Sequence, residues 1–273
     1  MKQKSSKKLL STSLLLVLIA LVSLTAATTA WMTIADSTRL KTMRLDVTSG
    51  ANLRFDLDSH ETFEEYVKSL RLIDIADRIL RDQGYHPREN PLSPVTTTDC
   101  IHFTLENGEP AAKESYMEFV LHFMATDDMV VHLTTAGEEG TRIFSDEVSD
   151  IAKAMRISFT ADDSTAVYDP GMEPGSEEGL GGKIFGLARG NRIVYDASNT
   201  LFFLKAGVDK PVTVRIWLEG TDEICTDALR GVPYNIQLRF VGTDENGNLL
   251  EDSRTTTRRS AAATPTEERN ENK

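Results

Sequence analysis

The sequence has few of the residues and motifs on which enzyme chemistry depends. Its 273 residues include two cysteines and five histidines, and no Cys-x-x-Cys pair is present. His-Glu-x-x-His and Gly-x-Ser-x-Gly motifs are also missing. These absences argue against thiol redox catalysis, a structural zinc knuckle, zinc-peptidase chemistry and serine-hydrolase chemistry. We therefore predict no catalytic residues, no cofactor and no enzymatic activity.

The apolar run near the N-terminus is too short to cross a bilayer. Leu14–Leu24 has 11 residues, whereas a membrane-spanning helix needs roughly 20. Four lysines and no acid precede the run, and small residues follow it as far as Ala30. This order is typical of a secretory signal peptide. We expect residues 1–30 to be a signal peptide cleaved near Ala30, or else an uncleaved anchor, and the remainder to be extracellular or at the cell surface.

Basic residues are outnumbered by acidic ones. Without the four lysines of the signal segment, 26 basic residues face 42 acids, so the exported chain has a net charge of about −16. Proteins that bind nucleic acid or an anionic membrane surface carry clustered Lys and Arg. The charge therefore argues against both partners. We expect contact with a membrane only through the N-terminal segment, if that segment is not cleaved.

Both cysteines, Cys100 and Cys225, lie in the exported part. An even number of cysteines in an oxidising exterior favours a disulfide. A bridge closing so long a loop would contribute roughly 4 to 5 kcal/mol in the chain-entropy model. Two unpaired thiols are the alternative.

The exported chain divides into a body and a tail. Residues 31–250 have the composition of a folded body, within which the Gly- and Pro-rich residues 169–182 predict a flexible loop. Residues 251–273 offer almost nothing to bury, and we expect a disordered tail.

Alternation of apolar and polar residues with period two predicts an all-β body with minor helices, folded as an antiparallel β-sandwich. The clearest strands are Ser115–Met124, Met129–Leu133, Pro211–Glu219 and Tyr234–Phe240. We expect the first two to form one hairpin around the loop Thr126–Asp128, and the last two to pair with each other. In Pro211–Glu219 the alternation places Trp217 on the face opposite the core.

Two segments have helical periodicity instead. Residues 60–83 read as an amphipathic helix that stops at Gly84, and Ser145–Met155 as a shorter one capped by Ser145. Both would cover an edge or end of the sandwich.

Histidines provide the best metal candidate. In the predicted hairpin His122 and His132 stand directly opposite each other, which brings two imidazoles within reach of one ion. Two ligands do not make a site, so the alternative is a pair of polar residues on the solvent face of a sheet.

Asp244–Asn248 has oxygen ligands at alternate positions, as a calcium loop begins. It lacks the later glycine and glutamate of such a loop, and a hairpin turn is the alternative.

Residues 26–50 contain the step Ala30-Trp31-Met32 and lead to Gly50. This stretch and several others resemble secreted surface proteins of the TasA and camelysin type in Gram-positive bacteria. Residues 26–50 resemble the start of those chains, where a dedicated signal peptidase cuts before an alanine-aromatic step; here the step is Ala30-Trp31-Met32. Uncharacterised clostridial surface proteins are similar over most of the body. Their motifs are matched here by Ile216–Cys225, Asn90–Asp99 and Ile151–Phe159.

This resemblance implies a jelly-roll-like sandwich and, for TasA-like proteins, fibres of a biofilm matrix. In such fibres the N-terminal strand of one subunit completes the sheet of the next, which is a form of β-strand addition. The segment carried over to this role contains Trp31, Met32, Leu45 and Val47. Camelysin-type chains are also classed as metallopeptidases, but no zinc-binding motif is present here, so that activity is not inferred.

Two functions follow as hypotheses. The first is an exported structural or interaction protein of the cell surface or matrix, whose partners are further copies of itself or other surface proteins. The second is an extracellular binding module for calcium, a glycan or a host ligand, with exposed aromatic residues such as Trp217 at a discrete pocket.

Overall fold

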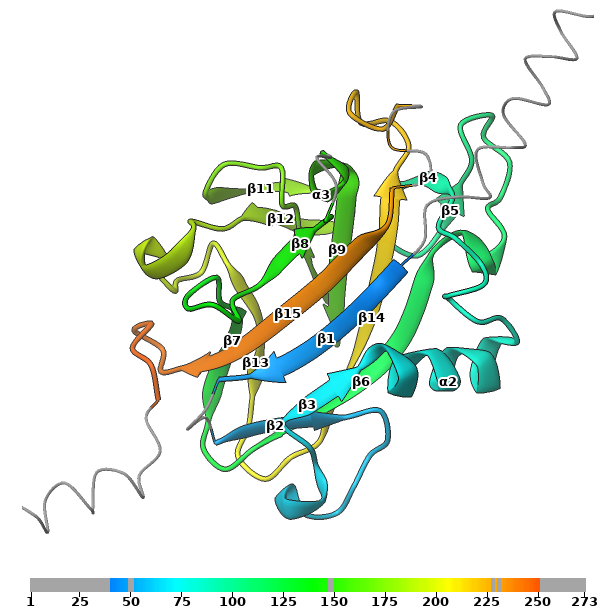
Figure 1. Cartoon of the computed structure of the whole chain (residues 1–273). Coiled ribbons are helices and arrows are strands. Elements are labelled where there is room, and N and C mark those ends of the chain that lie inside the picture. The colour runs from blue at the N-terminus through cyan, green and yellow to red at the C-terminus, as the bar shows by residue number, and fades with distance from the viewer. Residues whose placement is uncertain (1–39, 49–51, 147–149, 227–228, 230–231, 251–273) are drawn as a thin grey trace, which may run out of the picture.

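Two β-sheets form most of the part of the chain that the computed structural model describes, which is residues 40–48, 52–146, 150–226, 229 and 232–250. The predicted signal segment 1–30 and tail 251–273 lie outside these residues. The arrangement confirms the predicted all-β sandwich with minor helices (Figure 1). Three strand pairs, β1–β15, β10–β12 and β14–β4, are parallel, so the sandwich is mixed and not purely antiparallel.

The first sheet has six strands, in the order β13-β7-β15-β1-β3, with β8 also paired to β15. These strands are β1 (Leu40–Val47), β3 (Ser69–Arg71), β7 (Met129–Leu133), β8 (Arg142–Phe144), β13 (Thr200–Leu204) and β15 (Tyr234–Thr243).

The second sheet has nine strands, in the order β11-β12-β10-β9-β14-β4-β5, with β6 paired to β14 and β2 to β6. These strands are β2 (Leu53–Asp56), β4 (Pro94–Thr97), β5 (Phe103–Thr104), β6 (Met117–Ala125), β9 (Met155–Ala161), β10 (Ser164–Tyr168), β11 (Gly175–Gly179), β12 (Gly182–Gly186) and β14 (Lys210–Glu219). Short 3-10 turns occupy Phe63–Glu65, Lys113–Ser115 and Gly190–Arg192.

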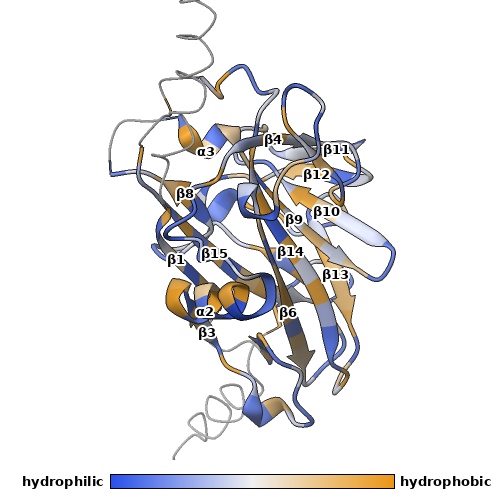
Figure 2. Cartoon of the chain, turned by 90° about the vertical axis from the view of Figure 1, so that its right-hand side faces the viewer, coloured by the Kyte–Doolittle hydropathy of each residue, from blue (hydrophilic) through white to orange (hydrophobic). Residues whose placement is uncertain are grey.

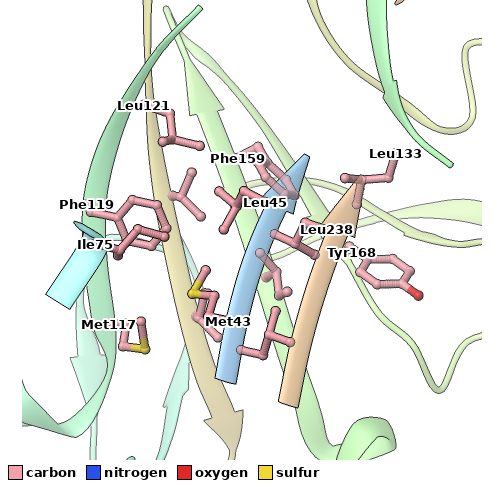
Figure 3. Close-up of a cluster of buried hydrophobic side chains, with 14 of the residues drawn as sticks. Met43, Leu45, Ile75, Met117, Phe119, Leu121, Leu133, Phe159, Tyr168 and Leu238 are labelled. Atoms are coloured by element: carbon pink, nitrogen blue, oxygen red, sulfur yellow. The ribbon is translucent and has the colours of Figure 1, made fainter. Parts of the chain in front are cut away.

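The main core lies between the sheets, because alternate side chains of each strand point to the facing sheet. Met43, Leu45 and Leu238 from the first sheet meet Phe119 and Phe159 from the second (Figure 3). Aromatic rings join the layers towards one end: the ring of Phe123 lies 5.6 Å from that of Phe55 and 5.2 Å from that of Phe240.

The predicted strands exist, but both predicted pairings are wrong. β6 pairs with β14 and β2, whereas β7 pairs with β13 and β15, so residues 126–128 connect the two sheets and do not form a hairpin turn. β14 and β15 likewise belong to different sheets. The alternation of apolar and polar residues indicates which face of a strand is buried. It does not determine the neighbouring strand, because several neighbours would leave the same face buried.

The predicted helix over residues 60–83 begins only at Leu72. Helix α2 (Leu72–Gln83) buries Leu72, Ile75, Ala76 and Ile79 and ends at Gly84, whose left-handed backbone (φ 83°) caps it. It lies along the open side of the sandwich, between β3 and β6 (Figure 2). Residues 66–71 are extended, because Val67 pairs with β2, residues 69–71 pair with β1, and the side chains of Tyr66 and Leu70 are buried.

Two further predictions are corrected. The second helix, α3, spans only Ile151–Ala154, because Met155 already begins β9. Most of the predicted flexible loop 169–182 belongs to the hairpin β11–β12. Its two-residue turn, Leu180-Gly181, has positive φ at both positions (53° and 75°), the backbone that a tight hairpin turn requires.

A second, smaller core lies on the outer face of the nine-stranded sheet. The segment containing β4 and β5 folds across that face and buries Trp217 against Val95, Cys100 and Phe103. The ring of Phe103 lies 5.4 Å from that of Trp217. Trp217 therefore faces away from the main core, as its position in the strand predicts, but it is fully buried.

Candidate functional site

Strand β1 contains the two described residues of the predicted assembly strand. Leu45 and Val47 are buried in the main core, and Trp31 and Met32 lie outside the described residues. β1 runs parallel to β15 along its length, but pairs with β3 only at Arg44–Asp46. The strand therefore occupies an inner position in its own sheet, and only three residues of another strand pair with its second edge.

A segment that we call the clasp, residues 57–71, covers this second edge and includes β3 (Figure 1). Val67 exchanges backbone hydrogen bonds with Phe55 of β2, at 3.0 and 3.1 Å. The carbonyl of Lys68 accepts a bond of 3.1 Å from the N–H of Val47 in β1. Because β1 and β2 belong to different sheets, the clasp joins the two sheets and closes one side of the sandwich.

Four polar side chains meet where the clasp reaches the second sheet, and we call them the Asp209 cluster. Oδ1 of Asp209 accepts a hydrogen bond of 2.8 Å from the Tyr66 hydroxyl. Its Oδ2 lies 2.9 Å from the Ser59 hydroxyl, which donates to it, and 2.9 Å from Nδ1 of His122. Ser59 and Tyr66 belong to the clasp, His122 to β6, and Asp209 directly precedes β14.

A second histidine adjoins the cluster. The ring of His60 packs edge-on against Tyr66, with centroids 5.0 Å apart, and its Nε2 lies 3.4 Å from Oδ2 of Asp56. Asp56 is the register partner of His122 in the β2–β6 pair. The Tyr66 hydroxyl also bonds the backbone N–H and carbonyl of His60. The buried ring of Tyr66 thus holds the turn of the clasp in place.

The cluster favours an ionised carboxylate. Partial burial on its own would raise the pKa of Asp209, but hydrogen bonds from His122, Tyr66 and Ser59 outweigh it, and the net pKa is lowered. Burial raises the pKa of the Tyr66 phenol, which therefore remains a hydrogen-bond donor at neutral pH.

The geometry differs from that of a nucleophilic triad. In such a triad the serine bonds the imidazole, which the carboxylate orients from the other side. Here the Ser59 hydroxyl bonds the carboxylate of Asp209 directly. Within the described residues, no group of three His, Cys, Asp or Glu side chains is arranged to hold a metal ion. The contacts therefore support a structural connection between the clasp and the second sheet.

Sequence reasoning did not find this cluster. Ser59 and Tyr66 of the clasp, His122 of β6 and Asp209 before β14 come from three segments that are distant in sequence, and they match no spacing motif. Only the pairing of β2, β6 and β14 brings them together.

The predicted pair of metal-ligating histidines is not formed. His122 faces Asp209, whereas His132 is buried against the first sheet, with Nδ1 2.7 Å from Oδ1 of Asn199 and Nε2 3.2 Å from the Thr243 hydroxyl. The two strands lie in different sheets, so the cross-strand geometry that would have joined the imidazoles is missing.

Burial lowers the pKa of His132, and the nearby Lys183 adds to the effect, although bonds to Asn199 oppose it. The unfolded chain therefore takes up a proton at this position more readily than the native chain as the pH falls below about 6.5. We expect the free energy of unfolding to decrease from pH 7 to pH 5, by at most about 1.4 kcal/mol per pH unit from this residue. A His132→Gln variant should lack that part of the decrease in urea titrations. Identical pH profiles would contradict this expectation.

The two cysteines are free thiols. Cys100 is fully buried in the second core, whereas Cys225 packs against the main core. Burial raises the pKa of each thiol to about 11, so neither is a ready nucleophile. The predicted disulfide is therefore not formed, and the alternative of unpaired thiols describes the structure.

Trp217 and the possible calcium loop at residues 244–248 both make their polar contacts within the protein. The indole N–H of Trp217 donates to Glu219 at 3.0 Å beneath the β4–β5 segment, so this ring presents no binding platform. Oδ1 of Asp244 accepts bonds from the backbone N–H groups of Asn246 and Asn248. Residues 244–248 form the turn after β15, with Thr243 bridged to Leu249.

An open pocket of about 400 Å³ lies at the C-terminal end of α2. Leu80 and Tyr85 give it an apolar side, and His86, Glu89 and Glu114 a polar one. Its lining residues match none of the predicted sites.

In the part of the chain that the structure describes, no helix is both long and apolar enough to span a membrane. Comparison with protein-family models, with curated proteins and with solved structures found no match to this chain.

Proposed function

We propose that this protein is an exported structural protein of the cell surface or extracellular matrix, which self-assembles when its N-terminal strand enters the sheet of another copy. The proposed export is supported by residues 1–30, whose basic, apolar and small-residue segments follow the order of a signal peptide. The resemblance of residues 26–50 to TasA-like chains supports the same function.

The position of β1 is the structural observation that carries the proposal. It is the first described element of the chain, and it supplies four buried side chains, Leu40, Met43, Leu45 and Val47, to the core. A second copy can supply the same strand and restore the same contacts. Exchange of an identical element therefore costs little in contact energy, as in domain swapping.

The chain connectivity is compatible with such an exchange. β1 precedes every other described element and is followed by β2, so among the described elements it is attached to the fold through one end only. Among the described strands its one long neighbour is β15, and the backbone hydrogen bonds between them can form equally well between two copies.

A cysteine trap tests the proposal. Thr42 of β1 is adjacent to Asn235 of β15, and their side chains are 2.6 Å apart. One chain would carry Thr42→Cys and another Asn235→Cys, each with Cys100 and Cys225 replaced by alanine. A disulfide between these two positions then has to join two molecules. We expect covalent heterodimers after the chains, starting at Trp31, are mixed and oxidised.

As a control, the two cysteines are introduced on strands for which no exchange is proposed. Thr160 of β9 and Thr213 of β14 are also register partners, on two inner strands. Chains carrying Thr160→Cys and Thr213→Cys separately should give no heterodimer above background. If the Thr42 and Asn235 pair also gives none, while the doubly substituted chain closes within one molecule, β1 remains in its own sheet and the proposal is wrong.

A further inference from the structure

The turn of the clasp is held by one arginine of β2, Arg54. Nη1 of Arg54 reaches the carbonyl oxygens of Phe63, Glu64 and Tyr66, at 3.0 to 3.3 Å. The guanidinium also lies over the ring of Phe63, 4.5 Å from its centre. Three hydrogen bonds and one cation–π contact therefore fix the shape of the turn between residues 63 and 66, and they also attach this turn to the second sheet.

Besides Arg54, a few other contacts attach the clasp to the rest of the molecule. Backbone bonds from Val67 and Lys68 and the three-residue strand β3 join it to β2 and β1. Arg78 of α2 bonds Asp58 and the carbonyl of Leu57. The Asp209 cluster attaches its turn to β6 and to the start of β14.

The second edge of β1 is covered by this segment and by α2. β1 cannot leave its sheet until the hydrogen bonds between Val47 and Lys68 and along β3 are broken. Those bonds belong to a strand of only three residues, so on their own they hold the clasp weakly. Tyr66, a few residues before β3, is buried and donates a hydroxyl bond to Asp209. Both contacts further stabilise the attachment of the clasp.

We infer that the Asp209 cluster is the latch of the clasp, and that release of this latch controls how often β1 becomes free to leave its own sheet. The role in assembly rests on the proposed strand exchange. The latch itself is a property of the single molecule, in which local opening differs from global unfolding.

Hydrogen–deuterium exchange on the monomeric chain tests the latch. Tyr66→Phe keeps the buried ring and removes only the hydroxyl that bonds Asp209 and His60. A hydrogen bond to a charged group is strong enough that its loss raises the population of the open state about tenfold. We expect amide exchange in peptides covering residues 40–48 and 66–71 to become about tenfold faster, with peptides of β9 and β10 unchanged.

Asp99 provides a matched control. It resembles Asp209 in accepting a hydroxyl bond, from Thr97, and in lying 2.7 Å from Nδ1 of a histidine, His102, but it is in the turn after β4. Asp209→Asn should accelerate exchange in the clasp and β1, whereas Asp99→Asn should leave both unchanged. Equal acceleration throughout the body, or none in the clasp, would overturn the inference.

The cysteine trap separates this inference from the proposed function. If the clasp is a latch and strands exchange, Tyr66→Phe should also make heterodimers of the Thr42→Cys and Asn235→Cys chains form several-fold faster. Local acceleration of amide exchange without any heterodimer would support the latch and refute strand exchange. Heterodimers that form at an unchanged rate in Tyr66→Phe would support strand exchange and refute control by the latch.

Discussion

Trp217→Ala is expected to lower the free energy of unfolding by about 3 to 5 kcal/mol, the range found for large aromatic residues removed from cores. Trp217 is fully buried, and it anchors the segment of β4 and β5 on the outer face of the nine-stranded sheet. The substitution leaves a cavity under Phe103 and removes the bond to Glu219. Urea titration followed by circular dichroism measures the loss.

A second substitution at Trp217 tests whether this residue stabilises the core or serves to bind a ligand. Trp217→Phe keeps an aromatic ring against Phe103 and should lose much less stability than the alanine variant. A loss for Trp217→Ala under about 1 kcal/mol, which is typical of surface substitutions, would contradict the structural role. Such a result would instead support the hypothesis that Trp217 is part of a ligand-binding site.

Arg156→Met has the second largest expected effect, because this guanidinium lies between two carboxylates. Nη2 of Arg156 in β9 is 3.0 Å from Oδ2 of Asp169 and 2.9 Å from Oδ2 of Asp222. The three side chains are only 12 to 19% exposed. Removal of one partner from a buried pair costs about 3 to 5 kcal/mol, and we expect about 3 here because some solvent reaches the site.

Two measurements test this explanation. Burial raises the pKa of Asp169, and Asp222 acts in the same direction, whereas Arg156 opposes both. In Arg156→Met the native chain should therefore bind protons more readily than the unfolded chain, and its stability should partly recover as the pH falls towards 4. Adding Asp169→Asn and Asp222→Asn should restore most of the loss at neutral pH. Failure of both would show that loss of the bonds from Arg156 to the carbonyls of Lys153 and Met155, and not the unpaired carboxylates, is responsible.

The extent of individual strands could be predicted from the sequence. Met129–Leu133 is a strand with the predicted bounds, and the strands predicted at 211–219 and 234–240 occur as Lys210–Glu219 and Tyr234–Thr243. Alternating burial is a local property, because successive side chains of a strand point to opposite faces. It therefore needs no knowledge of the rest of the fold.

The partners of those strands could not be predicted in the same way. β6 and β7 are separated by three residues, a length that suits a hairpin, but in a sandwich the same connection can pass from one sheet to the other. Both arrangements bury the same side chains. The error placed His122 opposite His132 and created a metal site that the structure does not form.

The helix over residues 60–83 shows how tertiary contacts override a local pattern. The spacing of Phe63, Tyr66, Val67 and Leu70 is compatible with a helix, but the α-helix begins only at Leu72, and residues 63–65 form a single 3-10 turn. The extended conformation of residues 66–71 is stabilised by pairing with β1 and β2 and by burial of Tyr66. Neither contribution is visible in the segment itself.

The sequence by itself determined the all-β class, the buried face of each clear strand and the end of α2 at Gly84. Each of these depends on residues close together in the chain, through side-chain alternation or backbone preference. The tertiary structure alone decided which strands pair, that Trp217 lies beneath β4 and β5, and that Asp209 connects the clasp to the second sheet. These contacts join residues distant in sequence, and competing partners would have satisfied the same local patterns.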